Sequence, residues 1–444
     1  MSVRNYRYYF MGQSVSMIGT WMQSTAQAWL VLKLTGSGVD LGLIIAAQTL
    51  PILLLGPVGG TIADRFGKYR ILWWTQAFAG VQALALSLLV LTGGAQLWLL
   101  FVFAVLLGLI NCLDNPTRQT FVGEMVPRDQ LRNAVTLNTV MVNLARAVGP
   151  AIAGVLIATV GIGWCFMLNA VSFIFVLAAL RAIHTDELHL ADPIVRGDGR
   201  GGLMEGFRYV ASTPLLRNAL LMMALVGTLS YEFQVSLPLM AKYTFHGGAE
   251  TYGVLTACVG IGAVVGGLIA ASRRNTAASA LVRAALFFGV AIGLAALAPD
   301  SLTEKLALLL VGAGSVTFLS LGSTTLQLSS DPAMRGRVMS LWSVAFMGST
   351  PIGGPVVGWI GSAAGPRWAL GIGAAAAIAA AALGWMTLVS SRKAPGAGEP
   401  DAGAGVVAAH TGGAGAAPVT AVDLADVADV APGDLGAAPG AGRR

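Results

Sequence analysis

The chain has 444 residues, of which 55% are hydrophobic and only 11% are charged, and its formal net charge is +6. A soluble protein of this length carries about a quarter charged residues, so most of this surface cannot face water. The composition excludes an ordinary soluble globular protein and indicates a protein embedded in a lipid bilayer.

Twelve apolar runs follow one another along the chain, each close to the roughly 20 residues that a helix needs to cross a bilayer. Leu, Ala and Gly fill these runs without the alternation of β-barrel strands, which predicts helices. We therefore expect an all-α membrane protein. The predicted spans are 8–34, 41–63, 71–92, 97–115, 134–159, 162–183, 215–241, 251–271, 279–298, 305–328, 337–361 and 367–390.

The basic residues gather on one side of the predicted membrane. With the N-terminus inside, the inner segments hold 22 of the 27 Lys and Arg, the outer loops hold 4, and Arg146 lies within a span. This asymmetry follows the positive-inside rule and predicts that both termini are cytoplasmic. A nucleic-acid-binding face would not be confined to every second loop, so we expect no nucleic-acid partner.

The loop between the second and third predicted spans carries the most specific motif, Gly60-Thr-Ile-Ala-Asp64-Arg65-Phe-Gly67-Lys68. Its glycines permit a tight turn, and Asp64 and Lys68 have the spacing of residues that meet on one helical turn. The alternative is an ordinary basic loop. The motif resembles the signature loop of the major facilitator superfamily, which implies twelve transmembrane helices in two pseudo-symmetric six-helix halves.

That resemblance implies a network of charges between the two halves. In the family, the loop aspartate interacts with the second half, and charged residues that close the fourth span join it. We expect this cluster to latch the outward-open state, so that breaking it biases a two-state equilibrium. Its residues here would be Gly60, Asp64, Arg65, Gly67, Lys68, Asp114 and Arg118.

The fifth predicted span carries a second family resemblance. Its Gly149-Pro150 pair, with Gly154, is similar to the Gly-Pro element of drug:proton antiporters. Together with the segments 115–119 and 127–134, it resembles the branch that includes macrolide-efflux proteins and the enterobactin exporter. Proline bends a helix and glycine lets a neighbour approach, so these residues would serve gating or packing. The fourth span lacks the Arg-x-x-Gln-Gly element of many antiporters, so the resemblance implies no coupling through it.

Two charged residues, Arg146 and Glu232, lie well inside predicted spans. A charge at a helix centre costs roughly 2.5–3.5 kcal/mol, so each needs a role or a local partner. Glu232 could bind and release a proton, and Arg146 could hold an anionic substrate or balance a deprotonated acid. The alternative for both is a local contact or snorkelling to the membrane surface.

Polar side chains follow the first predicted span in steps of three and four residues, which places them on one helical face. Such a face does not suit lipid, so we expect it to line a water-filled cavity or a helix interface. In the family's fold, the first helix of each three-helix repeat lines the central cavity. The expected lining residues, from this span and others, are Gln13, Ser16, Thr20, Gln23, Gln27, Asn143, Ser236 and Gln327.

Two short blocks of sequence repeat at an offset of 204 residues. The block 154–164 matches 358–368, and the pair 149–150 upstream lies opposite 353–354. Chance is the alternative for so short and glycine-rich a match, but a duplicated six-helix unit would place both copies at equivalent positions.

The chain is therefore expected to divide into an N-terminal half at 1–183, a cytoplasmic linker at 184–214 and a C-terminal half at 215–391. The segment 205–210 of the linker could form an amphipathic surface helix. The Ala/Gly/Pro-rich tail at 392–444 is expected to be disordered.

We predict a secondary active exporter of amphipathic small molecules of the drug, macrolide or siderophore type, working by proton antiport with alternating access. The alternatives are an importer or facilitator of the same fold, and a non-transporting sensor or assembly protein. Gly67-Lys68 is followed by Tyr69 and so fails as a phosphate-binding loop, which argues against an enzyme. We expect a monomer in the bacterial cytoplasmic membrane, with its cargo, protons and lipid as partners, no cofactor or metal, and a role in multidrug resistance.

Overall fold

The computed structural model describes residues 3–189, 202–272 and 278–393. Within these ranges the side chains of 57–61 and 63–65 are not described, so of the predicted charge cluster only the backbone is placed for Gly60, Asp64 and Arg65. The tail predicted at 392–444 lies outside the described residues from 394 onward. The described part of the chain consists of helices and loops without strands.

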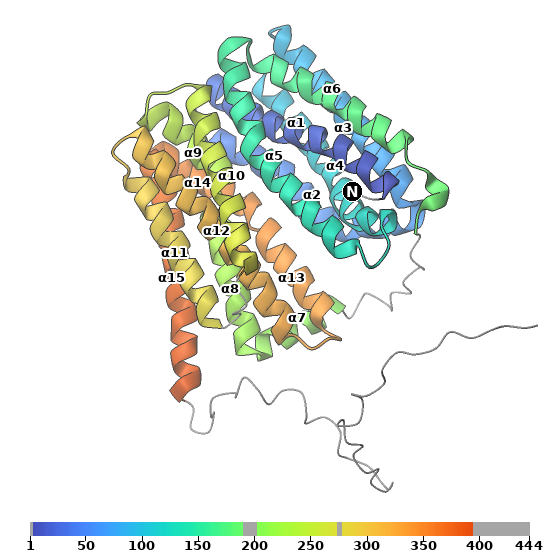
Figure 1. Ribbon diagram of the computed structural model, residues 1–444. Coiled ribbons are helices and arrows are strands. Elements are labelled where there is room, and N and C mark those ends of the chain that lie inside the picture. The colour runs from blue at the N-terminus through green and yellow to red at the C-terminus, as the bar shows by residue number, and fades with distance from the viewer. Residues whose placement is uncertain (1–2, 190–201, 273–277, 394–444) are drawn as a thin grey trace, which may run out of the picture. The chain divides into compact units, whose positions relative to one another are not determined.

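Six long helices form the N-terminal part of the bundle and alternate in direction (Figure 1). We call the side that carries Gly67 the basic side and the side that carries Gly36 the distal side. The helices are α1 (Arg4–Thr35), α2 (Gly38–Phe66), α3 (Lys68–Leu91), α4 (Leu97–Met125), α5 (Leu131–Thr159) and α6 (Ile162–Arg181).

The C-terminal part repeats this alternation, but two of its spans are interrupted. The span predicted at 215–241 is divided at 230–232, and the span predicted at 337–361 is divided at 348–349. After η1 (Thr185–Glu187) and α7 (Gly202–Ser212), the elements are α8 (Pro214–Leu229), α9 (Phe233–Leu239), the π-helix η2 (Met240–Thr244), α10 (Ala249–Ser272), α11 (Ala278–Leu297), α12 (Ser301–Ser329), α13 (Arg335–Met347), α14 (Thr350–Ala363) and α15 (Pro366–Lys393).

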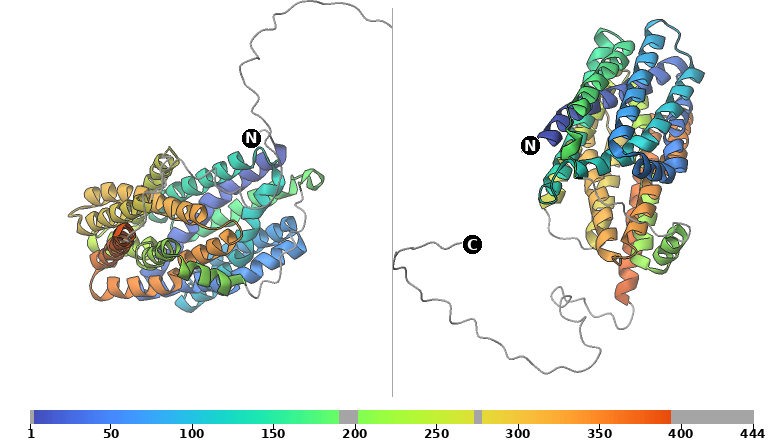
Figure 2. Two further views of the ribbon diagram at one scale, coloured as in Figure 1. Left: turned by 90° about the horizontal axis from the view of Figure 1, so that it is seen from below. Right: turned by 90° about the vertical axis from the view of Figure 1, so that its right-hand side faces the viewer.

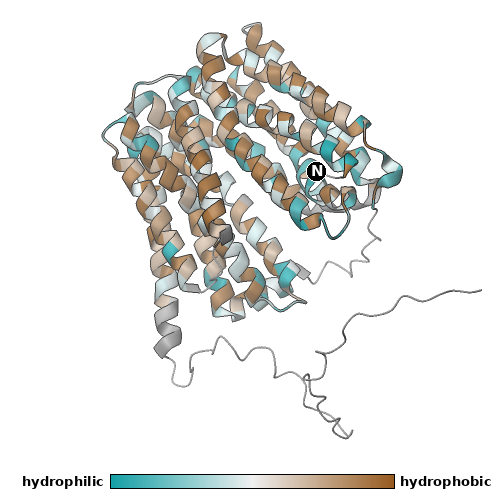
Figure 3. Cartoon of the chain, in the orientation of Figure 1, coloured by the Kyte–Doolittle hydropathy of each residue, from teal (hydrophilic) through white to brown (hydrophobic). Residues whose placement is uncertain are grey.

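Ten helical segments in the described part of the chain are long and apolar enough to cross a membrane, with α8 to η2 counted as one. The helix α1 falls short because buried residues such as Gln13, Gln23 and Gln27 lower its mean hydropathy. The pair α13–α14 falls short because each piece is too short. With these two spans the bundle has twelve, and Figure 3 shows hydrophobic helix bodies with hydrophilic residues concentrated near their ends.

The amphipathic helix predicted at 205–210 is confirmed as α7, which packs on α13 and α8 (Figure 2). Glu205 forms an ion pair with Arg337 at 3.0 Å, and the hydroxyl of Tyr209 accepts a hydrogen bond from the backbone N–H of Asp331 at 3.1 Å. The helix α7 is thus tied to the basic end of the C-terminal half.

The two halves meet along two pairs of helices, α5 with α10 and α2 with α14 (Figure 1). Glycines make this approach possible, because a backbone without a Cβ can lie directly against another. Gly253 of α10 lies against the carbonyl of Pro150, and Gly42 of α2 lies against the carbonyl of Gly354. Pro150 and Gly354 are 204 residues apart, so the sequence repeat marks equivalent positions in the two contacts between the halves.

Hydrogen bonds reinforce these contacts at the distal side. Lys242 Nζ donates to the carbonyl of Leu32 at 2.9 Å, and Tyr243 Oη donates to the carbonyl of Gly36 at 2.7 Å. Along their whole length, α3, α4 and α6 pack substantially only against helices of their own half. The structure is therefore a conformation that is closed at the distal side.

Candidate transport site

The interruption between α8 and α9 lies in the middle of the bundle and is held by tertiary hydrogen bonds. The hydroxyl of Ser230 donates to the carbonyl of Gly373 at 2.6 Å, and the hydroxyl of Tyr231 donates to the carbonyl of Ser315 at 2.6 Å. Glu232 follows with a non-helical backbone, φ −82° and ψ 44°. Non-helical backbone at membrane depth is tolerated where it is buried in protein or lines a cavity, which makes this segment a candidate site.

Glu232 is buried with 4% of its surface exposed, and its carboxylate lies against α14. A Cβ on Gly353 would lie 2.9 Å from Oε1, and a Cβ on Gly354 would lie 3.6 Å from Oε2, so both glycines leave room for the acid. The side chain of Thr350 hydrogen-bonds the carboxylate, but Oε1 has no partner. Glu232 forms no ion pair with any described residue. The carboxylate therefore lies buried with neither a counter-charge nor a full set of hydrogen bonds among the described residues.

Arg146 of α5 faces the same interruption from the other half. Its guanidinium carbon lies 5.0 Å from the centroid of the Trp21 ring, a cation–π geometry. Tyr231 is a neighbour of Arg146, and the Nε of Arg146 has no hydrogen-bond partner. Within the described residues Arg146 has no acidic partner, so its charge remains available for a ligand.

A cavity of about 180 Å³ opens inside the N-terminal half beside α1. Thr20, Gln23 and Gln27 of the predicted polar face line it, and Gln234 of α9 closes it from the other half. We call it the amide cavity, because carboxamides dominate its wall. Its lining residues are Thr20, Trp21, Gln23, Ser24, Gln27, Gln48, Ala79, Gln82, Leu107, Asn111, Asn169, Phe173 and Gln234.

The other residues expected to line a cavity lie elsewhere. Gln13 and Ser16 are buried on α1 but do not line the amide cavity. Asn143 donates to the carbonyl of Thr139 on its own helix at 3.0 Å. Ser236 donates to the backbone carbonyl of Glu232 at 3.1 Å and lines a small recess beside that residue, and Gln327 is exposed.

The predicted charge cluster is divided between two groups in the N-terminal half. Asp114 accepts hydrogen bonds from Thr75 Oγ1 at 2.8 Å and from Gln76 Nε2 at 2.7 Å, and its Oδ2 lies 3.5 Å from Nε of Arg118. Lys68 pairs instead with Glu124, at 2.6 Å.

Glu124 was not among the predicted residues, although Arg118, which also lies beyond 115, was. The fourth span was expected to end at 115. That boundary is wrong: α4 continues to Met125, since hydropathy marks where the membrane ends rather than where the helix ends.

The expectation that Asp64 and Lys68 meet on one helical turn is also wrong. The helix α2 ends at Phe66 and α3 begins at Lys68, and Gly67 between them has φ 81°, a left-handed conformation that favours glycine. The motif's glycine therefore separates the two charged residues onto different helices.

The Gly-Pro element of α5 lies at two helix contacts. A Cβ on Gly149 would lie 2.7 Å from Cβ of Trp21, so this glycine lets α1 approach. Pro150 and Gly154 face α10, and a Cβ on Gly154 would lie 3.0 Å from Cα of Glu250. The Gly-Pro element therefore lies both at a contact within the N-terminal half and at a contact between the halves. Its position is compatible with a packing role and with a gating role.

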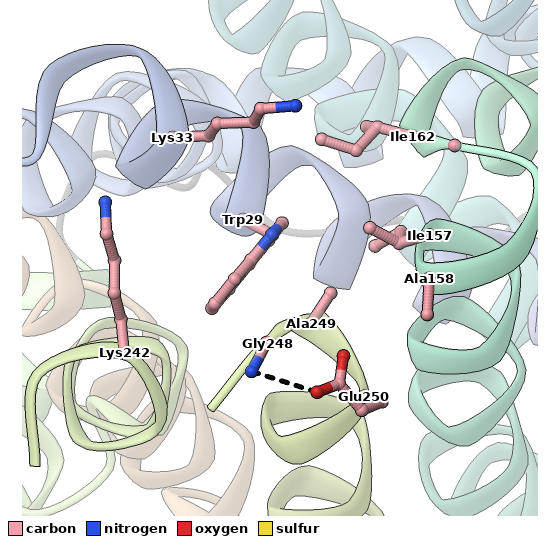
Figure 4. Close-up of a pocket in the computed structure, with 10 residues that line it drawn as sticks. Trp29, Lys33, Ile157, Ala158, Ile162, Lys242, Gly248, Ala249 and Glu250 are labelled. Atoms are coloured by element: carbon pink, nitrogen blue, oxygen red, sulfur yellow. Dashed lines mark hydrogen bonds between the residues drawn. The ribbon is translucent and has the colours of Figure 1, made fainter. Parts of the chain in front are cut away.

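A second cavity, of about 360 Å³, lies between the halves at the distal side (Figure 4). Trp29 and Lys33 of α1 face Lys242 and Glu250 across it, and Oε1 of Glu250 accepts a hydrogen bond from the N–H of Gly248 at 3.0 Å. The sequence offered no pattern for this cavity, because its residues come from five separate helix ends.

These features define a multi-pass membrane transporter of the major facilitator type. The chain matches the transmembrane secretion effector family over residues 1–398 and belongs to that family. The resemblance inferred from the loop at 60–68 and from the fifth span is thereby confirmed.

Curated relatives are similar over most of the bundle. The enterobactin exporter EntS of Citrobacter koseri is 27% identical over 341 residues, which cover 76% of this chain and 78% of that protein. The staphyloferrin A transporter of Staphylococcus aureus is 23% identical over 265 residues, which cover 59% of this chain and 66% of that protein.

Solved transporters share the fold at low sequence identity. A bacterial homologue of the lysosomal transporter Spinster, inward-facing and unoccupied, has a TM-score of 0.68 at 16% identity and covers 89% of this chain and 100% of its own. The peptide transporter POT in complex with sulfate has a TM-score of 0.71 at 15% identity. The match covers 88% of this chain and 94% of the POT chain.

Proposed function

We propose that this protein is a secondary active exporter in the bacterial cytoplasmic membrane that expels amphipathic small molecules in exchange for protons. The positive-inside rule places the basic side and both termini in the cytoplasm. The conformation closed at the distal side is then the inward-facing one. The similarity to the enterobactin exporter and to the staphyloferrin A transporter supports siderophore-type cargo over macrolides and other drugs.

The observation that carries the proposal is the buried, sparsely bonded carboxylate of Glu232 at a helix interruption between the halves. Deprotonated, it is a buried charge whose cost is relieved by solvent or by a change in the surrounding helices. Protonated, it is neutral and tolerates burial against Gly353 and Gly354. Proton binding can therefore bias the packing of α9 on α14, and through it the contact of α14 with α2.

Alternating access follows from the two helix pairs that join the halves. Opening the distal side would separate α5 from α10 and α2 from α14, while the basic ends of the halves close. The basic end of α2, which carries Asp64, would then meet the C-terminal half and latch the outward-open state. Protons entering from outside would reach Glu232 in that state and leave to the cytoplasm in the inward-facing one.

The test uses inverted membrane vesicles that are acidified inside and contain a pH-sensitive dye. Enterobactin, staphyloferrin A, macrolides and cationic dyes are added in turn to wild type, to Glu232→Gln and to Glu250→Gln, a matched carboxylate variant at the exposed distal rim. We expect cargo-induced proton efflux from the vesicles in wild type and Glu250→Gln and its loss in Glu232→Gln. Proton efflux that survives in Glu232→Gln would contradict the proposed coupling, and the absence of efflux with every compound would contradict proton antiport.

A further inference from the structure

We propose that the amide cavity and Arg146 form one two-part cargo site. Arg146 would bind a carboxylate or a similar anionic oxygen group, and the amide cavity would bind an uncharged part of the same molecule that carries amide or hydroxyl groups. The inference rests on the proposed transport function and names the class of cargo.

The wall of the amide cavity is ordered by its own hydrogen bonds. Nδ2 of Asn169 donates to Oε1 of Gln23 at 2.7 Å, and Nε2 of Gln23 donates to Oε1 of Gln82 at 3.2 Å. This chain joins α6, α1 and α3, so the polar wall is fixed before any ligand arrives. A fixed wall lowers the entropy that binding would otherwise cost.

Other carboxamides in the same wall have no hydrogen-bond partner among the described residues: Gln27, Gln48, Asn111 and Gln234 line the cavity in this state. Gln27 is only 5% exposed, yet its amide is not among the fully buried side-chain atoms that lack a partner, so its polar end is the part that reaches the cavity. A carboxamide both donates and accepts, so it complements amides and hydroxyls. None of the lining residues is charged, which disfavours an ionised group inside the cavity.

Arg146 lies beside this cavity by two independent connections. Trp21, on which the guanidinium stacks, also lines the cavity. Tyr231, a neighbour of Arg146, lies in the helix interruption three residues before Gln234, which closes the cavity. A guanidinium presents a planar fork of donors that matches a carboxylate, so the cation would hold the anionic end of a molecule whose neutral end enters the cavity.

The cavity's size sets how much of the cargo it can take. Its volume of about 180 Å³ is below the roughly 300–1,000 Å³ of pockets that enclose a drug-sized ligand. It therefore suits one fragment, such as an acylated amino-acid unit, rather than a whole large molecule.

Binding is tested by calorimetry on the full-length protein in lipid nanodiscs with three compounds of one shape. Hippurate carries both an amide and a carboxylate, its methyl ester lacks the charge, and 4-phenylbutanoate replaces the amide by methylenes. We expect hippurate to bind at least tenfold more tightly than either analogue, because each analogue leaves one part of the site unpaired.

Variants separate the two parts of the site. Gln27→Leu and Asn111→Leu should weaken hippurate binding at least tenfold and leave 4-phenylbutanoate unchanged, and Arg146→Gln should remove the difference between hippurate and its ester. Asn133→Leu, an amide at the exposed start of α5, serves as the matched control, and the melting temperature of each variant reports folding.

Three outcomes would overturn the inference. The wild type could bind the three compounds equally or show no saturable binding of any of them. Alternatively, the folded variants could keep the selectivity of the wild type. Binding needs no proton gradient, so this failure is distinguishable from a failure of antiport, which the vesicle assay measures. Glu232→Gln should retain hippurate binding whatever it does to proton movement.

Discussion

The two halves use the same packing scheme around different chemistry. In the N-terminal half, Gly149 lies against the carbonyl of Ile18 and against Trp21 on the continuous helix α1. In the C-terminal half, Gly353 lies against the carbonyl of Thr228 and against Glu232, where the helix is interrupted. The glycines are 204 residues apart and the two carbonyls 210, so these are equivalent contacts in a duplicated unit.

Equivalent positions in the two halves carry different residues, which indicates a division of labour in which one half binds cargo and the other binds a proton. Met22 stands at the place in α1 that corresponds to Glu232, and Arg146 stands at the place in α5 that corresponds to Thr350, again at offsets of 210 and 204 residues. The N-terminal half therefore contributes a cation and unpaired amides, which suit cargo. The C-terminal half contributes an acid and a helix interruption, which suit a proton.

The largest expected effect comes from placing the acid in the wrong half. Met22→Glu should lower the free energy of unfolding by about 3 kcal/mol, because Met22 is 4% exposed on an uninterrupted helix and the new carboxylate would be buried within a membrane span. Glu232→Met should instead stabilise the fold while abolishing proton-driven transport. Both are measured by denaturant unfolding in mixed micelles, and a destabilised Glu232→Met would show that the acid is structural.

The contacts between the halves should be sensitive to a single methyl group. Gly253→Ala puts a Cβ against the carbonyl of Pro150, and overpacking of about 2 kcal/mol would shift the equilibrium about thirtyfold away from the distal-closed state. Gly267→Ala on the same helix is the control, because its Cβ would meet Val316 at an ordinary 3.5 Å. Spin-label distances between the distal ends of α5 and α10 report the shift, and equal distances in both variants would contradict this view of the contact.

The ion pair between Lys68 and Glu124 should stabilise the N-terminal half alone. Removing either partner should cost about 1.5 kcal/mol, since the side chains are 16% and 10% exposed and the remaining charge is partly desolvated. The reversed pair, Lys68→Glu with Glu124→Lys, should recover most of this loss in a double-mutant cycle of unfolding free energies. Additive effects of the two reversals would mean that the pair contributes no coupling energy.

The smallest expected effect concerns one hydrogen bond at the distal side. Tyr243→Phe removes the bond to the carbonyl of Gly36, worth about 1 kcal/mol, and should shift the equilibrium about fivefold toward the distal-open state. Tyr69→Phe removes a bond to Leu180 within one half and should leave the equilibrium unchanged. Single-molecule fluorescence between the distal ends of the halves gives both populations, and similar shifts in the two variants would contradict the assignment.

Much of the fold was predictable because lipid constrains it so strongly. Apolar run length identified the spans, but it could not reveal the interruption at 230–232, where no proline or glycine stands. That interruption depends on hydrogen bonds from Ser230 and Tyr231 to helices more than 80 residues away. Helix ends beyond the membrane, such as Met125 of α4, likewise leave no signal in hydropathy.

The candidate site was predictable only where a residue was unusual for a membrane. Arg146 and Glu232 were identifiable because charges are rare in apolar spans. The amide cavity was predictable only in part, because the spacing of polar residues along α1 identified only Gln23 and Gln27 among its carboxamides. Its other carboxamides stand singly on separate helices, and only the packing of the bundle brings them together: Gln48, Gln82, Asn111, Asn169 and Gln234.

The most direct test of the division of labour measures proton release when cargo binds. Hippurate is added to wild type, Glu232→Gln and Gln27→Leu in weakly buffered nanodiscs with a pH indicator, and binding is measured in parallel. The account predicts binding with proton release in wild type, binding without release in Glu232→Gln, and neither in Gln27→Leu. Proton release that persists in Glu232→Gln, or binding that is lost there, would contradict the assignment of cargo and proton to different halves.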